Sequence, residues 1–237
     1  MEDGWPKNKN FVFCFVLFSL IRTFAPRMEK KVKAALFDLD GVVFDTEPQY
    51  TIFWGAQCRE FHPEHPGLEH EIKGQTLTQI YSRYFSSDVL SSKQALITRR
   101  LDAYESSMHY DYIAGFEEFI KSLRSSGIKT AVVTSSNKVK MENVYRQHPE
   151  FKGLFDAILT SEDFDRSKPD PDCYLKGAAR FGAAPSECVV FEDSFNGLRS
   201  GRSAGMTVVG LSTTNPADSI APLCDEVISD YINYQLK

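Results

Sequence analysis

Four short apolar segments, each followed directly by polar or acidic residues, limit what this chain can fold into. They cover residues 32–39, 129–134, 188–191 and 207–211, and a weaker segment of the same kind covers residues 157–160. Continuous apolar runs of this length are typical of strands that are buried on both faces of a parallel sheet. The chain is therefore expected to build a parallel sheet with helices on both faces.

Helical patterns fall between these apolar segments. Residues 116–125 place four apolar side chains on one helical face, and Gly127 follows as a stop signal. Residues 171–181 and 194–204 are also expected to be helical. The alternation of strands and helices predicts a doubly wound α/β fold, in which right-handed crossovers connect the strands of a parallel sheet.

One stretch, residues 47–114, contains no clear buried strand. Pro48 can open a helix there, and residues 72–85 and 93–104 also have helical patterns. We therefore expect a helical insertion over residues 47–114, directly after the loop of the first strand. The remaining residues, which are assigned to the α/β core domain, are 28–46 and 115–237.

The first 27 residues do not fit the α/β pattern. Residues 11–21 form a continuous apolar run that follows Lys7 and Lys9. A helix that spans a bilayer needs about 20 apolar residues, and no convincing small-residue cleavage site follows this run. We expect residues 1–27 to be an extension outside the fold, with translation starting at Met28, rather than a segment for export.

The overall composition favours a cytoplasmic globular protein. Hydrophobic residues make up 42% of the 237 residues, charged residues make up 25%, and the formal net charge is −5 without a basic run. Nucleic acid and membranes are therefore not expected as partners. Five cysteines at wide spacing, with no Cys-x-x-Cys motif, argue against a disulfide framework and a thiolate zinc site.

Acidic and hydroxyl side chains gather at the carboxyl ends of the expected strands. In an open α/β sheet the active site forms in the crevice beyond those ends. The residues at these positions are Asp38 and Asp40, then Thr134, Ser135 and Ser136, then Lys168, and then Glu192 and Asp193. One edge of the sheet would therefore bring together several carboxylates, a lysine and several hydroxyls.

Carboxylates in one buried cluster repel one another and need cations nearby. One Mg²⁺ ion and Lys168 would supply three positive charges against the four carboxylates of the strand ends. A hard cation with oxygen ligands is what such carboxylates select, and no His or Cys falls among these strand-end residues. The sequence therefore predicts a Mg²⁺ site.

This set of side chains suits phosphoryl transfer. A carboxylate can attack phosphorus and form an aspartyl-phosphate, which divides one difficult step into two. The metal and the lysine neutralise charge on the phosphoryl oxygens, and a hydroxyl can donate to another of them. A second carboxylate, two residues from the first, can act as acid for the leaving oxygen and then as base for the attacking water.

Together these motifs resemble the haloacid dehalogenase superfamily, in the branch that contains phosphoglycolate phosphatase-like sugar phosphatases and β-phosphoglucomutase. The matching pieces, in the family's order, are Asp38-x-Asp40-Gly41-Val42 with Asp45-Thr46-Glu47, Val132-Val133-Thr134-Ser135, Lys168-Pro169, and Glu192-Asp193-Ser194 with Gly197. The resemblance covers about residues 32–215. It implies a Mg²⁺-dependent phosphatase that hydrolyses a small phosphorylated metabolite of the sugar phosphate type through an aspartyl-phosphate.

The resemblance also implies a role for each acidic residue of the core. Asp38 would be the nucleophile and a Mg²⁺ ligand. Asp40 would be the general acid/base and would bind the metal through its backbone carbonyl. Asp193 would bind Mg²⁺ directly, and Glu192 would contribute to the metal site through water.

Phosphate binding is implied for Thr134, for the amide of Ser135 and for Lys168, which would bridge Asp38 and the phosphate as a catalytic residue. The insertion 47–114 resembles the helical cap of the family, which closes over the site and excludes water. The cap loop that resembles the substrate-specificity loop comprises Lys73, Gly74, Gln75 and Thr76.

An isomerase resembling β-phosphoglucomutase is the main alternative. That subfamily has a cap histidine ten residues beyond the second Asp, where this chain has Tyr50. It also has an arginine four residues beyond the loop lysine, where this chain has Leu77. Both differences weigh against a mutase, whereas the shared Lys73-Gly74 pair favours one.

The core residues also bear on three further functions. A dehalogenase does not need an acid/base at the second Asp, so the presence of Asp40 argues against it. A non-catalytic binding module is disfavoured because Asp38, Lys168 and Asp193 are all present. Inorganic pyrophosphate is a conceivable substrate, because its hydrolysis needs the same core chemistry.

Overall fold

The computed structural model describes Met1 and residues 31–236. The apolar run 11–21, which belongs to the expected N-terminal extension, lies outside these residues. From Val32 onward the chain forms one compact unit. Across the described residues, no helix combines the length and the apolar character needed to cross a membrane.

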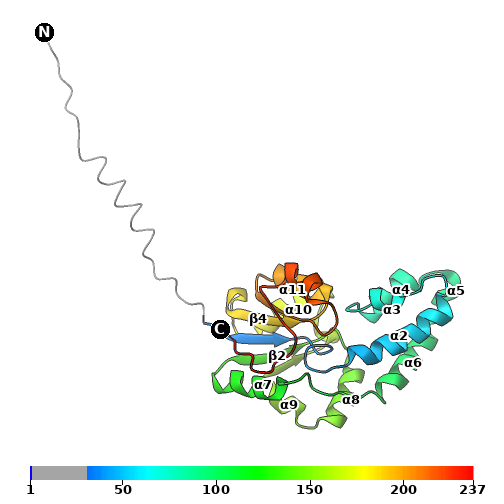
Figure 1. Ribbon diagram of the computed structural model, residues 1–237, viewed down its shortest axis with the longest axis horizontal. Coiled ribbons are helices and arrows are strands. Elements are labelled where there is room, and N and C mark those ends of the chain that lie inside the picture. The colour runs from blue at the N-terminus through cyan, green and yellow to red at the C-terminus, as the bar shows by residue number, and fades with distance from the viewer. Residues whose placement is uncertain (2–30, 237) are drawn as a thin grey trace. The chain divides into compact units, whose positions relative to one another are not determined.

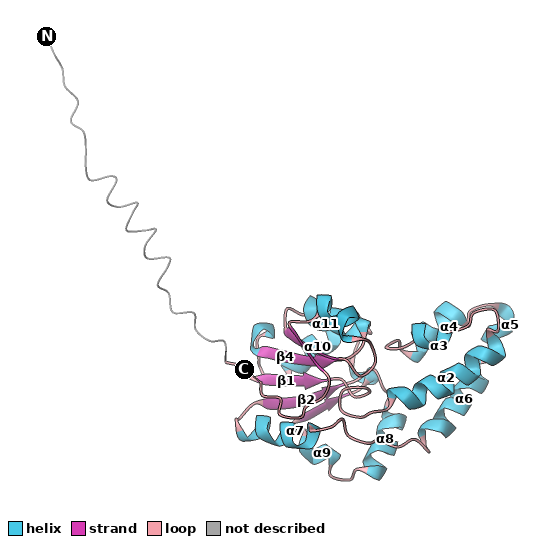
Figure 2. Cartoon of the chain, in the orientation of Figure 1, coloured by secondary structure: helices cyan, strands magenta, loops and turns pink. Residues whose placement is uncertain are grey.

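A six-stranded parallel sheet is the centre of this unit, with the strand order β3-β2-β1-β4-β5-β6 (Figures 1 and 2). The strands are β1 (Ala34–Phe37), β2 (Lys129–Val133), β3 (Ala157–Leu159), β4 (Cys188–Glu192), β5 (Thr207–Leu211) and β6 (Glu226–Ile228). Because β1 lies between β2 and β4, the chain winds first to one side of β1 and then to the other. This arrangement confirms the predicted doubly wound α/β fold.

The first five strands lie where the apolar segments predict them, to within two residues at either end. The sequence does not indicate β6, because this strand has only three residues and all of them are only half-buried. A short, half-buried edge strand that begins with Glu226 lacks the continuous apolar run of the central strands.

Helices cover both faces of the sheet (Figure 1). The apolar side chains of α7, α8 and α9 belong to one hydrophobic cluster, and those of α10, α11 and α12 belong to another. Their bounds are α7 (Phe116–Ser125), α8 (Lys138–Gln147), α9 (Phe151–Leu154), α10 (Asp172–Ala179), α11 (Phe195–Ser203) and α12 (Ala217–Ile220). Three short 3₁₀ turns complete the core at Ser161–Asp163, Pro185–Glu187 and Ala221–Leu223.

The helices from α2 to α6 form the inserted helical segment, called the cap helices below. Their bounds are α2 (Glu47–Phe61), α3 (Leu68–Glu71), α4 (Leu77–Tyr84), α5 (Asp88–Ser91) and α6 (Gln94–Glu105). They enclose a hydrophobic cluster of their own, which includes Phe53, Trp54, Ile80 and Ile97. The exact domain boundaries, before residue 47 and after residue 114, stay a prediction.

The expected helix over residues 72–85 is shorter than the sequence indicates. Residues 72–76 form a turn, because Gly74 adopts a left-handed φ of +68° and Thr76 caps the next helix. The Thr76 hydroxyl accepts the Gln79 amide at 3.3 Å, and the Gln79 side chain accepts the Thr76 amide at 2.8 Å. This reciprocal capping starts α4 at Leu77 and leaves the preceding turn free to face the core.

Candidate active site

The floor of the site is a hydrogen-bonded cluster at the ends of the adjacent strands β1 and β4. Lys168 Nζ lies 2.7 Å from Asp38 Oδ1 and 2.6 Å from Glu192 Oε1. The same ammonium group donates to the carbonyl oxygen of Val133 at 3.1 Å, and only 4% of the Lys168 side chain is exposed. The structure therefore joins Asp38 and Lys168, which lie 130 residues apart in the sequence, in one buried ion pair.

Burial controls the charges of this cluster. It raises the pKa of Asp38 to about 7, a rise that Lys168 opposes and that Glu192 and Asp40 reinforce. Burial also disfavours the charged form of Lys168, but the neighbouring Asp38 and Glu192 raise the pKa of this ammonium group above its ordinary value. Lys168 is therefore a cation at neutral pH, and it stabilises the ionised form of Asp38.

Glu192 has donors on both of its carboxylate oxygens. Oε1 accepts hydrogen bonds from Lys168 and from the hydroxyl of Tyr174 at 2.9 Å. Oε2 accepts from the backbone amides of Asp193 and Ser194 and from the Ser194 hydroxyl, each at 3.1 Å. Glu192 therefore orients Lys168 and the start of α11, and it has no uncommitted oxygen in this arrangement.

Asp193 is fixed in a narrow space. The Thr214 hydroxyl donates to its Oδ2. Gly41 has a φ of +70°, and a Cβ at this position would lie 2.2 Å from Asp193 Oδ2, so only glycine lets the loop pass here. Burial raises the pKa of Asp193 well above its ordinary value, and neighbouring carboxylates, with Glu192 first, add to the rise.

A divalent cation fits these carboxylates. Oxygen atoms of Asp38, Glu192 and Asp193 all lie within 4.8 Å of one another. Asp38 and Asp193 each keep one carboxylate oxygen that accepts no hydrogen bond among the described residues. Both carboxylate oxygens of Glu192, in contrast, accept hydrogen bonds. Since no His or Cys occurs among the described residues that line the pocket, the donor set is all oxygen and suits a hard cation.

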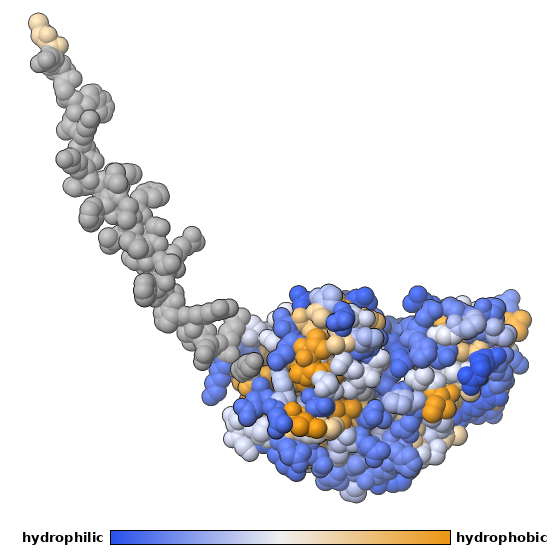
Figure 3. All heavy atoms as spheres, in the orientation of Figure 1, coloured by the Kyte–Doolittle hydropathy of each residue, from blue (hydrophilic) through white to orange (hydrophobic). Residues whose placement is uncertain are grey.

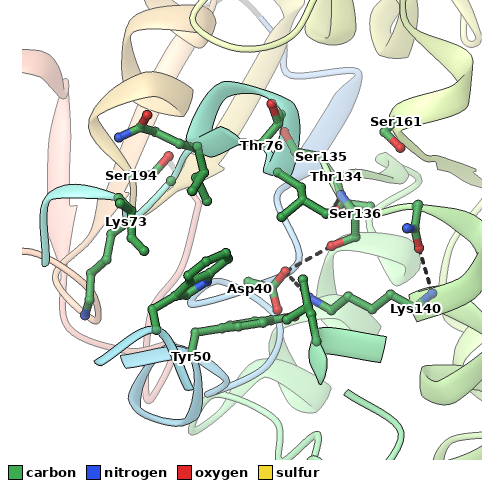
Figure 4. Close-up of a pocket in the computed structure, with 18 of the residues that line it drawn as sticks. Asp40, Tyr50, Lys73, Thr76, Thr134, Ser135, Ser136, Lys140, Ser161 and Ser194 are labelled. Carbon is green, nitrogen blue, oxygen red and sulfur yellow. Dashed lines mark hydrogen bonds and ion pairs between the residues drawn. The ribbon is translucent and has the colours of Figure 1, made fainter. Parts of the chain in front are cut away.

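Asp40 is held by three donors. The Thr46 hydroxyl donates to its Oδ1 at 2.5 Å, and the Ser136 hydroxyl donates to its Oδ2 at 3.1 Å. Lys140 Nζ also contacts Oδ2 (Figure 4). Lys140 is almost fully buried, and its Nζ lies 4.6 Å from the centroid of the Tyr50 ring. Asp40 is therefore anchored both by the core and by Thr46, which directly precedes α2.

Lys140 is a site residue that the motifs do not indicate. It lies on α8, beyond the strand-end residues, and its neighbours on the buried face are Met141 and Val144. A lysine at a buried position of an amphipathic helix is unusual without a partner. Both the burial of Lys140 and its pairing with Asp40 become visible only in the fold.

The end of β2 supplies hydroxyl and amide donors. Thr134 is buried, and its Oγ1 accepts the backbone amide of Ser136 at 3.0 Å, so its hydroxyl hydrogen is left to donate elsewhere. Thr134 and Ser135 line the same pocket as Asp38. Their positions suit phosphate oxygens, and their role as phosphate ligands stays a prediction.

The cap loop lies against the core. A Cβ on Gly74 would lie 2.5 Å from the Cβ of Ser194, so the loop approaches α11 closely at this glycine. The Asn196 side chain donates to the Gly74 carbonyl at 3.2 Å. The Gln79 side chain donates to the carbonyl of Lys168 at 3.0 Å. The cap helices therefore contact the backbone of the residue that holds Asp38.

One pocket of about 520 Å³ lies between the core and the cap helices. Its core side includes Asp38, Asp40, Thr134, Ser135, Lys168 and Asp193, and its cap side includes Tyr50, Trp54, Lys73, Gly74, Gln75 and Thr76. Figure 4 shows Lys73 and Ser194 on one side of this pocket and Ser136 and Lys140 on the other. Figure 3 shows a largely hydrophilic surface on the displayed face, with apolar residues in small groups. Every site residue expected from the sequence, except the buried Glu192, therefore lines a single pocket.

A doubly wound core with Asp38, Asp40, Lys168 and Asp193 at its strand ends, beneath inserted helices, defines a haloacid dehalogenase-like architecture. Residues 35–211 match the family model described as haloacid dehalogenase-like hydrolase. The match covers most of the chain and all four strand-end motifs. The chain therefore belongs to the haloacid dehalogenase-like hydrolases.

Individual relatives agree with this assignment. The chain is 33% identical to hexitol phosphatase A of Escherichia coli, over 83% of this chain and 89% of that protein. It is 30% identical to a probable pseudouridine-5'-phosphatase of Drosophila melanogaster, over 78% and 84%. It is 26% identical to the β-phosphoglucomutase of Bacillus subtilis, over 78% and 85%.

A solved structure supports the fold. A haloacid dehalogenase family hydrolase from Entamoeba histolytica superposes with a TM-score of 0.74 at 21% identity, over 86% of this chain and 96% of that one. At this identity the likeness shows a shared fold, which includes both the parallel core and the inserted helices because the superposition spans nearly the whole described chain.

Proposed function

We propose that the chain is a cytoplasmic, metal-dependent phosphatase that hydrolyses a small phosphorylated metabolite of the sugar phosphate type. The observation that carries the proposal is the setting of Asp38. Its Oδ1 lies 2.7 Å from Lys168 Nζ, at the floor of a pocket that Asp40, Thr134 and Asp193 also line. The names of two relatives, a hexitol phosphatase and a probable pseudouridine-5'-phosphatase, point to the same chemistry.

In the first half-reaction, an oxygen of Asp38 bonds to phosphorus while the bond from phosphorus to the ester oxygen breaks. This step requires the protonated form of Asp40, which donates its proton to the leaving oxygen, so the product leaves as an alcohol. Lys168 neutralises negative charge on a phosphoryl oxygen, and Thr134 donates its hydroxyl hydrogen to another. The result is a phosphorylated Asp38 and an ionised Asp40.

In the second half-reaction, the ionised Asp40 accepts a proton from a water molecule while the water oxygen attacks phosphorus. The bond between phosphorus and Asp38 breaks, inorganic phosphate leaves, and both carboxyl groups return to their starting states. The cap loop and the Gln79 contact to Lys168 help to exclude other water from the pocket during these steps.

The metal is proposed to be Mg²⁺, held by Asp38, Asp193 and the backbone carbonyl of Asp40. A bound Mg²⁺ ion supplies positive charge to the phosphoryl oxygens. The carboxyl group of Glu192 would act indirectly, since both of its oxygens already accept hydrogen bonds that fix Lys168 and the start of α11.

A β-phosphoglucomutase-like isomerase is the second candidate, favoured by the Lys73-Gly74 pair and by the mutase among the relatives. The pocket itself favours the hydrolase. The Tyr50 hydroxyl donates to Glu105 Oε1 at 2.7 Å, and Leu77 lines the pocket at the start of α4. These positions supply neither the histidine nor the arginine of the mutase subfamily.

The test is a screen for phosphate release from many phosphate esters and from pyrophosphate, with Mg²⁺ present, and with Asp38→Asn as the matched control. We expect phosphate release that depends on Asp38. β-Glucose 1-phosphate is included, with NMR detection of glucose 6-phosphate. Isomerised product without phosphate release would favour the mutase. If none of the esters releases phosphate, the proposed phosphatase function is refuted.

A further inference from the structure

The cap side of the pocket carries more acidic than basic groups. Lys73 is the one basic residue of the cap helices and their loops among the described residues that line the pocket. The acidic residues that line it from the same part of the chain are Glu47, Glu69, Asp102 and Glu105. A ligand group that enters this side therefore meets more carboxyl groups than ammonium groups.

Glu47 has a buried oxygen without a donor. Its Oε2 is inaccessible to solvent and accepts no hydrogen bond, and 9% of the residue is exposed. Lys73 Nζ is 3.8 Å from this oxygen, which is beyond hydrogen-bonding distance. Because a buried acceptor without a donor is costly, a ligand hydroxyl that donated here would be bound favourably. Glu47 begins α2, so this acceptor lies where the cap helices join the core.

The other two lysines of the pocket already have anionic partners. Lys140 is paired with Asp40, and Lys168 is paired with Asp38 and Glu192. Arginine is absent from the described residues that line the pocket. Among the three lysines that line the pocket in the described residues, Lys73 is therefore the least firmly held, because its only anionic partner is the distant Glu47. A second anionic group on the substrate would have to compete with the carboxylates of the cap for the ammonium group of Lys73.

Aromatic rings complete the cap side. Tyr50 and Trp54 line the pocket, and the hydroxyl of Tyr50 is already used as a donor to Glu105. Flat apolar faces beside carboxylate and threonine oxygens suit a carbon skeleton that carries several hydroxyl groups. Such a skeleton can pack its C–H groups on the rings and donate its O–H groups to the acceptors.

We infer that the substrate carries a single phosphate and that its leaving group is an uncharged polyol, either a sugar or a sugar alcohol. Glu47 accepts a hydrogen bond from one of its hydroxyls, and the cap carboxylates exclude substrates that bear a second anionic group. This inference rests on the proposed phosphatase function. It also bears on the isomerase, because phosphoryl transfer from an enzyme to a sugar phosphate passes through a bisphosphate, which this pocket would disfavour.

The first experiment measures kcat/KM for two matched pairs of substrates at constant free Mg²⁺. Fructose 1-phosphate is compared with fructose 1,6-bisphosphate, and sorbitol 6-phosphate is compared with hexyl phosphate. We expect the added phosphate to lower kcat/KM by at least about tenfold, because it faces like charge in the cap. We expect the hydroxyl-free hexyl phosphate to be poorer than sorbitol 6-phosphate by a similar factor, because it leaves Glu47 Oε2 unpaired.

The second experiment assigns these preferences to residues. Glu47→Met should reduce the preference for sorbitol 6-phosphate over hexyl phosphate, and Glu47→Gln, which keeps an acceptor oxygen, should retain more of it. Neutralising Glu69 and Asp102 together, as Glu69→Gln with Asp102→Asn, should narrow the gap between fructose 1-phosphate and its bisphosphate. Glu118→Gln, which removes an exposed charge on α7 away from the pocket, should change neither ratio.

Equal or better use of the bisphosphate by the unmodified enzyme would overturn the inference and leave the phosphatase intact. In that case Lys73→Met should remove the preference for the bisphosphate, which would show that Lys73 binds the second phosphate group. An unchanged substrate ratio in Glu47→Met would overturn the role of Glu47. Failure to release phosphate from every ester would instead overturn the proposed function on which the inference rests.

Discussion

Lys140 and Asp40 form an ion pair inside the pocket, although they lie 100 residues apart in the sequence. The Lys140 side chain is 4% exposed, so the pair is largely shielded from water. Breaking a buried pair by removing one partner leaves an uncompensated charge. The contact therefore fixes the orientation of the carboxylate that is proposed to serve as both acid and base.

Lys140→Met is expected to lower kcat by about 10- to 100-fold with little change in KM, because general acid-base catalysis contributes about 100- to 10,000-fold and a misplaced Asp40 loses part of that contribution. Steady-state kinetics on the best substrate of the screen measures both constants. Lys138→Met is the matched control, since Lys138 is exposed at the start of the same helix. An unchanged kcat in Lys140→Met would show that Asp40 does not depend on this lysine.

Asp38→Asn is expected to reduce kcat by about three orders of magnitude or more, because the amide cannot act as nucleophile. The fold should persist, since Lys168 still has Glu192 as an anionic partner. Thermal unfolding followed by circular dichroism should therefore stay cooperative. A substantial residual kcat would remove Asp38 from the nucleophile position.

The central strands and the core motifs could be predicted from the sequence because each rests on local patterns. A strand buried on both faces must be continuously apolar, and in an open sheet its carboxyl end faces the crevice. These two rules are sufficient to bring Asp38, Lys168 and Asp193 together. They also explain why β6, a short half-buried edge strand, leaves no comparable signal.

Contacts between distant elements could not be predicted in this way. The pairing of Lys140 with Asp40 and the contact of Gln79 with the Lys168 carbonyl both depend on how helices dock on the core. The unpartnered Oε2 of Glu47 depends on the position of Lys73, which a turn fixes rather than the expected helix. Residues that act through tertiary contacts therefore had no motif that would identify them.

Chelation with EDTA is expected to abolish activity, and Mg²⁺ is expected to restore it, because the buried carboxylates of Asp38 and Asp193 repel each other without a cation. Mg²⁺ at about a hundred times its Kd should stabilise the fold by about 2.7 kcal/mol, which raises Tm by about 5 °C or more. Differential scanning calorimetry with and without Mg²⁺ measures this shift.

Asp193→Asn should lose most of the Mg²⁺-dependent rise in Tm, because it removes one of the two carboxylates that keep an uncommitted oxygen. Asp88→Asn, at an exposed position on α5, should keep the full rise. Full activity after rigorous chelation, or an equal shift in both variants, would contradict the metal site.

The stability of the protein should depend on pH through Glu47. Burial raises the pKa of Glu47 to about 7 from an ordinary value of 4.5, and the nearby Asp40 adds to the rise while Lys73 opposes it. Between these two values the folded protein retains a proton that the unfolded chain has released. The free energy of unfolding therefore falls as pH rises from about 4.5 to about 7, and then levels off.

Glu47→Gln carries no titrating proton at this position, so it should escape that loss. We expect the variant to unfold with nearly the wild-type free energy at pH 5 and to be more stable by about 3 kcal/mol at pH 8, since the pKa of Glu47 rises from 4.5 to about 7 and each unit corresponds to about 1.4 kcal/mol. Urea denaturation in the presence of EDTA measures the free energy of unfolding of the variant and of the wild type at each pH. The charge of Glu47 also reinforces the raised pKa of Asp193, so the gain of the variant at pH 8 includes a smaller cost of ionising Asp193. Identical pH profiles for the variant and the wild type would mean that Glu47 is ionised in the folded protein, and its unpartnered oxygen would then have a donor.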